Sequence, residues 1–233
     1  MIKVKNLKKY FYSGIFRKRI IKAVDNVSFE IKEGETLGLV GESGSGKTTI
    51  GKTILRLIEP TSGEIFFNDI NVRKLKGNEL KDIRKKMQII FQNPESALNP
   101  RMKIYDSLKE PLRIHKLCNK REEKKRILEL IEDVSLDKEI LNRYPHELSG
   151  GQIQRIVLAR VLTLNPKFII ADEPTSMLDV SVQAQILNLM KKLQREFKLT
   201  YLFISHDLDV VKWMSDEIIE IDNGRIVRRI SNF

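Results

Sequence analysis

Hydrophobic and polar residues alternate in the N-terminal third of the chain. Val27, Phe29 and Ile31 are separated by polar residues, and turn-forming residues occur at Gly34 and at 60–63. Alternation with a period of two is typical of a strand with one buried face, as in an antiparallel sheet. The N-terminal third is therefore predicted to form an antiparallel β subdomain.

Three other segments are apolar at nearly every position, namely 36–40, 168–171 and 201–204. Continuous apolar runs of this length are typical of parallel strands buried on both faces. Apolar residues at helical spacing lie beside these strands, at Ile50, Ile54, Leu57 and Ile58 and at Ile186, Met190, Leu193 and Phe197. Strands that alternate with amphipathic helices predict an α/β fold.

The middle and the end of the chain show two further patterns. From about 93 to 165 the strand pattern disappears, and charged amphipathic stretches such as 120–134 predict an inserted helical subdomain. Near the end, two strand-like runs at 217–221 and 225–228 flank Asp222-Asn223-Gly224. Because Asn-Gly tolerates positive φ, this segment predicts a β-hairpin.

Composition narrows the class of protein. The 233 residues include a single cysteine, and 42 Lys and Arg against 31 Asp and Glu give a net charge of +11. One cysteine excludes an internal disulfide and a cysteine-rich zinc site. The absence of an apolar stretch of about 18 residues, and of a signal-like start, predicts a cytoplasmic protein. The positive charge, including the basic runs 17–19 and 81–86, leaves nucleic acid, anionic membranes and nucleotides as candidate partners.

A phosphate-binding motif follows the first buried strand. It comprises Gly41, Glu42, Ser43, Gly44, Ser45, Gly46, Lys47 and Thr48, which fit G-x-x-x-x-G-K-[ST]. Glycines allow successive backbone N–H groups to point at phosphate oxygens, Lys47 adds a positive charge, and Thr48 offers a hydroxyl to Mg²⁺. The alternative, a plain glycine turn, does not explain the register of Lys47 and Thr48 after an apolar strand.

A second buried strand ends abruptly in Asp172 and Glu173. Ligands of α/β sheets bind at the carboxyl ends of the strands, so these acids are expected beside the phosphates. Asp172 is placed to hold Mg²⁺, and Glu173 to polarise the water that attacks a γ-phosphate. The alternative is a strand capped by solvated acids, which the phosphate loop makes the weaker interpretation.

The third motif is Leu148-Ser149-Gly150-Gly151-Gln152, which opens an amphipathic helix upstream of the acidic strand. With this motif, the chain resembles the ATP-binding subunits of ABC transporters along nearly its whole length. The resemblance implies a P-loop NTPase core of the ABC ATPase type that carries the antiparallel β subdomain and the helical subdomain within one domain, 1–233. It also implies ATP and Mg²⁺ as ligands and a head-to-tail dimer in which this five-residue signature closes over the partner's ATP.

The resemblance assigns roles to further residues. Glu173, His206, Gln92 and Lys47 are implied as catalytic, and Thr48, Gln92 and Asp172 as metal-binding. Tyr10 is implied as the aromatic that stacks on adenine, with Phe11 and Tyr12 as alternatives. The implied nucleotide-binding set comprises Tyr10, residues 41–48, Thr49, Ser149, Gly150, Gly151, Gln152 and Asp179.

Two longer stretches, 92–102 and 178–187, are similar to the ATPases of oligopeptide, dipeptide and nickel importers. Such importers imply a second ATPase subunit, with a heterodimer favoured over a homodimer, two membrane-spanning permease subunits, an external solute-binding protein, and a place on the cytoplasmic face of the membrane. Glu95 and Met177 depart from the usual residues of this branch. The alternative is an ATPase of DNA repair or chromosome maintenance, but the chain lacks the sustained heptads and cysteine sets of those proteins.

Overall fold

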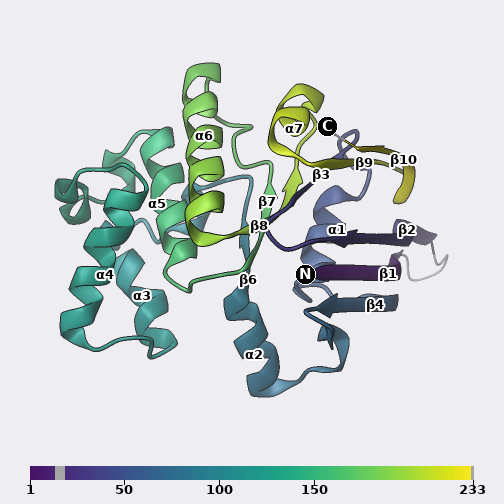
Figure 1. The fold of residues 1–233 in the computed structure, drawn as a ribbon, viewed down its shortest axis with the longest axis horizontal. Helices are drawn as coiled ribbons and strands as arrows, with labels where there is room; N and C mark the ends of the chain where they lie inside the picture. The colour runs from purple at the N-terminus through teal and green to yellow at the C-terminus, as the bar shows by residue number, and fades with distance from the viewer. Residues whose placement is uncertain (14–18, 232–233) are drawn as a thin grey trace.

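Two β-sheets and a group of helices make up the fold in the computed structural model, which describes residues 1–13 and 19–231 (Figure 1). The antiparallel sheet has the order β2-β1-β4-β5 and contains β1 (Ile2–Ser13), β2 (Arg19–Ile31), β4 (Ser62–Phe67) and β5 (Ile70–Asn71). The other sheet has the order β10-β9-β3-β8-β7-β6 and contains β3 (Thr36–Val40), β6 (Met87–Ile90), β7 (Phe168–Asp172), β8 (Thr200–Ile204), β9 (Glu217–Asp222) and β10 (Arg225–Ser231). The predicted α/β class and the antiparallel N-terminal sheet are confirmed.

Helices pack on both faces of the second sheet, and on one of these faces they also pack against the antiparallel sheet. The α-helices are α1 (Lys47–Ile54), α2 (Gly77–Lys86), α3 (Ile104–Ile114), α4 (Lys120–Asp133), α5 (Gly150–Leu162), α6 (Val180–Phe197) and α7 (Leu208–Met214). Short 3₁₀ helices are η1 (Val72–Lys74), η2 (Glu95–Ala97), η3 (Lys138–Asn142) and η4 (Pro145–Glu147). Between β6 and β7 the chain is helical and forms no strand, as expected for 93–165, although treating that stretch as a subdomain stays a prediction.

The three buried runs are parallel neighbours in the second sheet, in the order β3, β8, β7. Each is buried at every position because its side chains alternate between two hydrophobic clusters. Ile169 and Phe203 pack with α3, α4, α5 and α6, whereas Ile170 and Leu202 pack with α1 and the antiparallel sheet. The helical insert therefore shares its core with one face of the parallel sheet.

The first predicted helix is shorter than the hydrophobic pattern suggested. The pattern extended the helix to Ile58, but α1 ends at Ile54 and Leu57 is 49% exposed. Arg56 adopts a left-handed conformation with φ of 51°, and its guanidinium donates to the carbonyl oxygens of Val72 and Leu75. This tertiary anchor turns the chain away from the helix axis, which a local periodicity cannot reveal.

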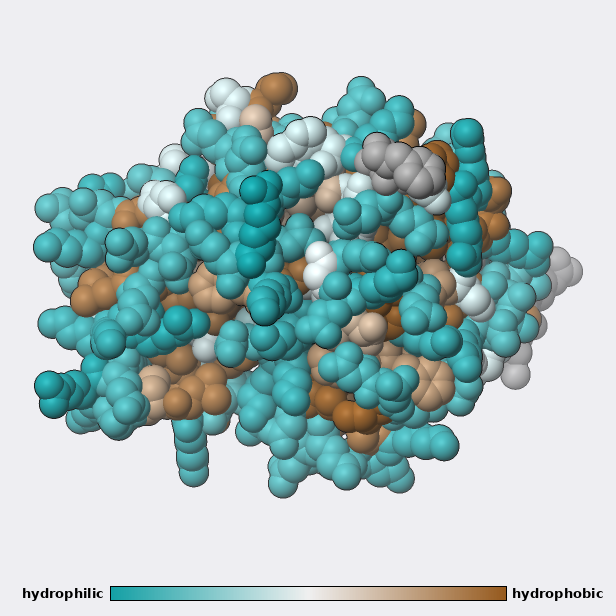
Figure 2. Space-filling model, in the orientation of Figure 1, coloured by the Kyte–Doolittle hydropathy of each residue, from teal (hydrophilic) through white to brown (hydrophobic). Residues whose placement is uncertain are grey.

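The C-terminal hairpin forms as predicted, with Asn223 and Gly224 at positive φ of 46° and 75° between β9 and β10. Polar and charged side chains cover most of the face seen in Figure 2. Of the two basic runs, 81–86 lies in α2, while Arg17 and Lys18 fall outside the described residues. Among the helices of residues 1–13 and 19–231, none combines the length and hydropathy that a membrane span requires.

Candidate active site

The phosphate loop connects β3 to α1, and its lysine begins the helix. Lys47 is 5% exposed, and its ammonium donates to the carbonyl oxygens of Gly41 and Glu42, both at 2.7 Å. Burial lowers the pKa of Lys47, while the nearby carboxylates of Glu173 and Asp172 oppose that shift. The loop thus wraps around a lysine that faces two acids, an arrangement able to bind a polyanion.

Backbone from two distant segments fixes the shape of this loop. The N–H of Gly224, in the β9–β10 turn, donates to the carbonyl of Ser45 at 2.9 Å. Gly46 has φ of 108°, and a Cβ there would lie 2.2 Å from the carbonyl oxygen of Ala23 in β2. Gly41 is confined in the same way by Ile221. Only glycine fits such contacts, so the cradle depends on both sheets.

An ion pair holds the two distant segments together. Asp25 of β2 accepts two hydrogen bonds from the Arg225 guanidinium, at 2.5 and 2.9 Å, and one from the Tyr10 hydroxyl at 2.5 Å. Its side chain is 8% exposed. These bonds, the one from Tyr10 first, hold the pKa of Asp25 below the ordinary value of 3.8. The ion pair therefore ties β10 to the sheet that packs against the phosphate loop.

We expect Asp25→Asn to lower the thermal stability of the protein at neutral pH. Because the pKa of Asp25 is depressed on folding, its stabilising contribution is present above about pH 4 and is lost as the pH falls through the folded pKa. Melting temperatures of the variant and the parent protein should converge in acid. Asp222→Asn, at the exposed end of β9 in the same hairpin, is the matched control and should melt like the parent at every pH.

A carboxylate and a hydroxyl meet below the phosphate loop. Thr48 Oγ1 donates to Asp172 Oδ1 at 2.9 Å, and Asp172 is 4% exposed at the end of β7. Burial raises the pKa of Asp172, against the hydrogen bond from Thr48. Protein Mg²⁺ is usually held by one or two carboxylates together with substrate phosphates, so this oxygen pair beside the cradle fits that ion. No cluster of three or more metal-ligating side chains occurs among the described residues.

Glu173 makes direct contacts with two of the other three predicted catalytic side chains. Gln92 Nε2 donates to Glu173 Oε2 at 2.9 Å, and His206 Nδ1 lies 3.3 Å from Glu173 Oε1. Glu173 has φ of 50°, a strained conformation for a non-glycine residue. Its N–H donates to the carbonyl of Ile204, which fixes the residue at the edge of the sheet. The carboxylate is thereby held between an amide and an imidazole.

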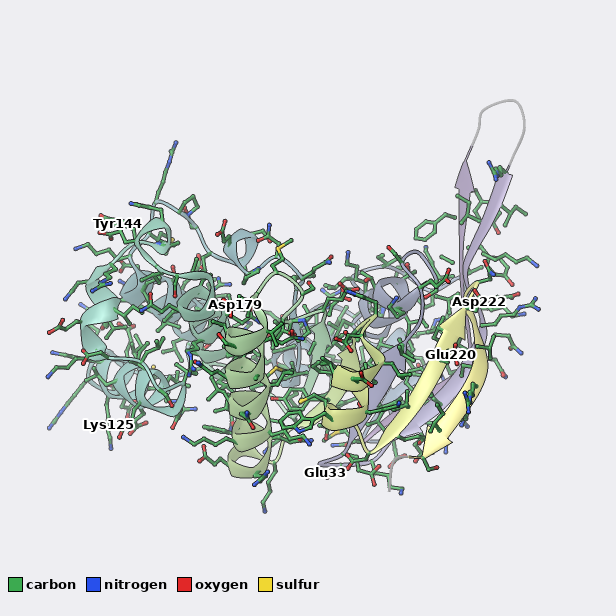
Figure 3. All side chains as sticks on the ribbon, turned by 90° about the horizontal axis from the view of Figure 1, so that it is seen from above. Glu33, Lys125, Tyr144, Asp179, Glu220 and Asp222 are labelled. Carbon is green, nitrogen blue, oxygen red and sulfur yellow. The ribbon has the colours of Figure 1, made fainter. Side chains whose placement is uncertain are left out.

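Glu173, Gln92, His206 and most of the phosphate loop face one open pocket of about 860 Å³, whereas Asp172 is not among its lining residues. Its wall contains Gln92, Glu173, His206 and residues 43–49 of the phosphate loop and α1. The rest of the wall was not predicted as part of the site: Ile20, Ile21, Lys22, Ala23, Asn223 and Gly224. Figure 3 shows the yellow β9 and β10 beside the strands of the antiparallel sheet, with Asp222 at the end of β9. No motif in either segment signals this meeting.

Tyr10 does not line the pocket in this structure. Its hydroxyl is bonded to Asp25, and the Lys22 ammonium lies 5.7 Å from the centre of its ring. The predicted stacking of Tyr10 on adenine therefore has no support from the geometry. The apolar wall of the pocket is provided instead by Ile20 and Ile21, which are 52% and 51% exposed.

The signature motif and Asp179 lie outside this pocket. Ser149 caps α5 in a capping box with Gln152. Gly150 lies against Leu178, just before α6, and Gly151 against Val182, in the first turn of α6. A Cβ on Gly151 would lie 2.6 Å from Val182. Asp179, labelled in Figure 3, caps α6. It accepts hydrogen bonds from Val182 N and Ser181 Oγ, which lower its pKa. The chain thus presents a second, exposed glycine surface apart from the phosphate loop.

Comparisons with known proteins agree with this arrangement. The family model described as ABC transporter matches residues 24–176. The chain is 54% identical to the oligopeptide transport ATP-binding protein OppF of Bacillus subtilis over 97% of this chain and 74% of that protein. It is 51% identical to AppF, named likewise and from the same organism, over 94% of this chain and 68% of that protein.

A solved structure shares the whole fold. The ATP-binding cassette MJ0796, in a dimeric post-hydrolysis state bound to ADP and Pi, is 36% identical and superposes with a TM-score of 0.88, covering 100% of this chain and 99% of that one. None of these relatives supports the alternative of a DNA-repair ATPase. Given the matched family model and identities above 50%, the chain belongs to the ABC transporter family, as one of its ATP-binding cassettes.

Proposed function

We propose that this ABC-family ATPase is the motor subunit of a membrane importer for oligopeptides. The observation that carries the proposal is the contact of Glu173 with both Gln92 and His206 in the pocket that the phosphate loop lines. Named relatives at 54% and 51% identity are oligopeptide transport ATP-binding proteins, which favours peptides over nickel. A motor of this kind works at the cytoplasmic face of the membrane, bound to its permease.

Each side chain in the pocket has a defined part in hydrolysis. Lys47 and the N–H groups of the phosphate loop bind and orient the phosphates. Glu173 accepts the proton of the attacking water. At the same time the oxygen of that water bonds to the γ-phosphorus, and the bond from the γ-phosphorus to the β–γ bridging oxygen breaks, giving ADP and phosphate. Gln92 orients that water, and His206 holds the carboxylate and contacts the γ-phosphate.

Thr48, Asp172 and Gln92 are the residues that would hold Mg²⁺. When bound, the ion neutralises charge on the phosphates. The burial of Asp172 supports this role. Burying an ionised carboxylate costs free energy unless a cation pairs with it.

A groove that borders the segment around Gln92 is the proposed docking site for the permease. This groove of about 540 Å³ runs between β6, α3 and α5, and its wall includes Phe91, Ala97, Ile114, Val157 and Arg160. Phe91 and Ile114 are large apolar residues that are 37% and 58% exposed. Exposed apolar residues in a groove fit a partner helix or loop, and Phe91 directly precedes Gln92 in the chain.

We also propose that the second ATPase is a different subunit, as the likeness to peptide-importer ATPases implies, with a solute-binding protein outside the membrane. The exposed signature surface and Asp179 would complete the partner's site. The related cassette MJ0796 is described as a dimer, which supports pairing through nucleotide. A homodimer is the alternative, and the roles of the signature residues and Asp179 depend on such a partner.

Peptide should stimulate ATP hydrolysis by the assembled importer. The test reconstitutes this chain with its permease, partner ATPase and binding protein in lipid vesicles and measures phosphate release with a peptide mixture, with Ni²⁺, or with neither. We expect a several-fold increase with peptide alone. Stimulation by Ni²⁺ alone would reassign the solute, and a rate indifferent to every solute would contradict an importer motor.

A further inference from the structure

One arginine of the signature helix joins three segments of the helical insert. Arg160, in the third turn of α5, donates from Nε to the carbonyl of Ser107 at 3.1 Å and from Nη1 to the carbonyl of Ala97 at 3.2 Å. Its Nη2 donates to Glu110 Oε2 at 2.6 Å. Ser107 and Glu110 belong to α3, and Ala97 ends η2. All three nitrogens of the guanidinium therefore donate a hydrogen bond.

The acceptor in η2 belongs to a braced turn that begins next to Gln92. Asn93 Oδ1 accepts hydrogen bonds from the N–H groups of Glu95 and Ser96, at 3.0 and 3.3 Å. Ser96 Oγ donates to the carbonyl of Asn93 at 2.7 Å. Because these hydrogen bonds hold the turn together, a displacement of the Ala97 carbonyl would also displace Gln92, whose amide contacts Glu173.

The other end of the connection is the signature. Arg160 lies on α5, which Ser149 caps, so one continuous hydrogen-bonded helix joins Arg160 to the signature. The guanidinium also forms part of the wall of the apolar groove, together with Ala97, and the side chain is 31% exposed. A partner seated in that groove therefore meets the residue that fixes the turn after Gln92 relative to α5.

We propose that Arg160 is a positioning residue for ATP hydrolysis. Arg160 links occupancy of the groove to the placement of Gln92 against Glu173 and to the orientation of the signature helix. The inference rests on the proposed docking of the permease in the groove. Arg160 does not line the nucleotide pocket, so it acts through Gln92 and through α5. Lysine keeps the charge but cannot supply a planar fork to three acceptors, which makes Arg160→Lys the informative change.

The same helix offers a matched control. Arg155 donates to the carbonyl of Val134 at 3.0 Å and to Gln185 Oε1 at 3.3 Å, so it also anchors α5, but to α6 and the end of α4. It contacts neither η2 nor the groove. Arg155→Lys therefore removes a comparable arginine from α5 and leaves the turn after Gln92 untouched.

Two measurements on each variant test the proposal. Amide hydrogen exchange on the isolated chain should show faster exchange at residues 93–98 in Arg160→Lys and parent-like exchange there in Arg155→Lys. In the reconstituted importer, Arg160→Lys should lower the solute-stimulated kcat about tenfold with the KM for ATP unchanged, since a displaced catalytic side chain costs rate rather than substrate binding. Glu110→Gln, which keeps both carbonyl contacts, should give a smaller decrease.

The possible results distinguish a failure of the role proposed for Arg160 from a failure of the importer function. Unchanged exchange at 93–98 in Arg160→Lys would show that the arginine does not hold the turn, and would overturn the proposal. Faster exchange with a parent-like kcat would overturn its link to hydrolysis. If the parent importer itself shows no solute-stimulated hydrolysis, the importer function fails instead, and the kcat of the ATP-bound ATPase dimer alone then carries the same comparison between Arg160→Lys and Arg155→Lys.

Discussion

Replacing Glu173 by glutamine is expected to abolish ATP turnover while ATP binding is kept. Glutamine has the same size and can still meet Gln92 and His206, but its amide cannot accept the proton of the attacking water. Loss of a general base costs about 10²- to 10⁴-fold in rate. The measurement pairs phosphate release under saturating MgATP with the equilibrium affinity for ATP, and we expect the first to fall and the second to stay near the parent value.

A matched change far from the pocket controls for the loss of one negative charge. Glu33 is exposed in the turn between β2 and β3 and does not line the nucleotide pocket, so Glu33→Gln should keep full turnover. Hydrolysis at the parent rate by Glu173→Gln would sink the assignment of the base. A variant that also loses ATP would instead show that the carboxylate is needed to build the pocket.

The same variant decides the composition of the dimer, because ATP that is bound and not hydrolysed should hold two cassettes together. Its mass in solution is measured with and without MgATP. A mass that stays monomeric while ATP binds, and doubles when the second importer ATPase is added, supports the heterodimer. A monomer that dimerises with itself on adding ATP would favour the homodimer.

The phosphate loop and the residues at the ends of the parallel strands were accessible from the sequence. Gly41 to Thr48 form a cradle because a glycine-rich turn between a buried strand and a helix has few other shapes. Glu173, Gln92 and His206 could be expected to meet because each follows a strand of one parallel sheet, and the carboxyl ends of parallel strands share an edge.

The remaining wall of the pocket depends on contacts between segments that are distant in the chain. The hairpin turn contacts the phosphate loop through the hydrogen bond from Gly224 to Ser45, and the ion pair of Asp25 with Arg225 ties β10 to β2. No local pattern encodes an ion pair between residues 200 positions apart. Tyr10 lies outside the pocket lining for another reason. The pairing of β1 with β2 shifts register between Lys9 and Tyr10, and such a shift changes which side chains face the pocket.

The close approach at Gly46 leads to the other large effect. We expect Gly46→Ala to weaken ATP binding at least about 100-fold. A Cβ at this position would lie 2.2 Å from the carbonyl oxygen of Ala23, where only backbone could give way, and φ is 108°. The loop must then shift, and losing two charge-assisted hydrogen bonds to phosphate, at about 1.5–3 kcal/mol each, corresponds to a factor of about 10² to 10⁴ in affinity.

The control for backbone strain is Gly34→Ala. Gly34 also has a positive φ, 80°, but a Cβ there would have no atom within 4 Å, and the turn lies outside the nucleotide pocket. Both variants carry the strain of alanine in a left-handed conformation, so any common fall in melting temperature reports that strain. ATP affinity, measured by equilibrium titration on samples with parent-like circular dichroism, should fall in Gly46→Ala alone. Equal affinities in the two variants would mean that the antiparallel sheet does not confine the phosphate loop, and that the cradle keeps its shape without the contact between Gly46 and Ala23.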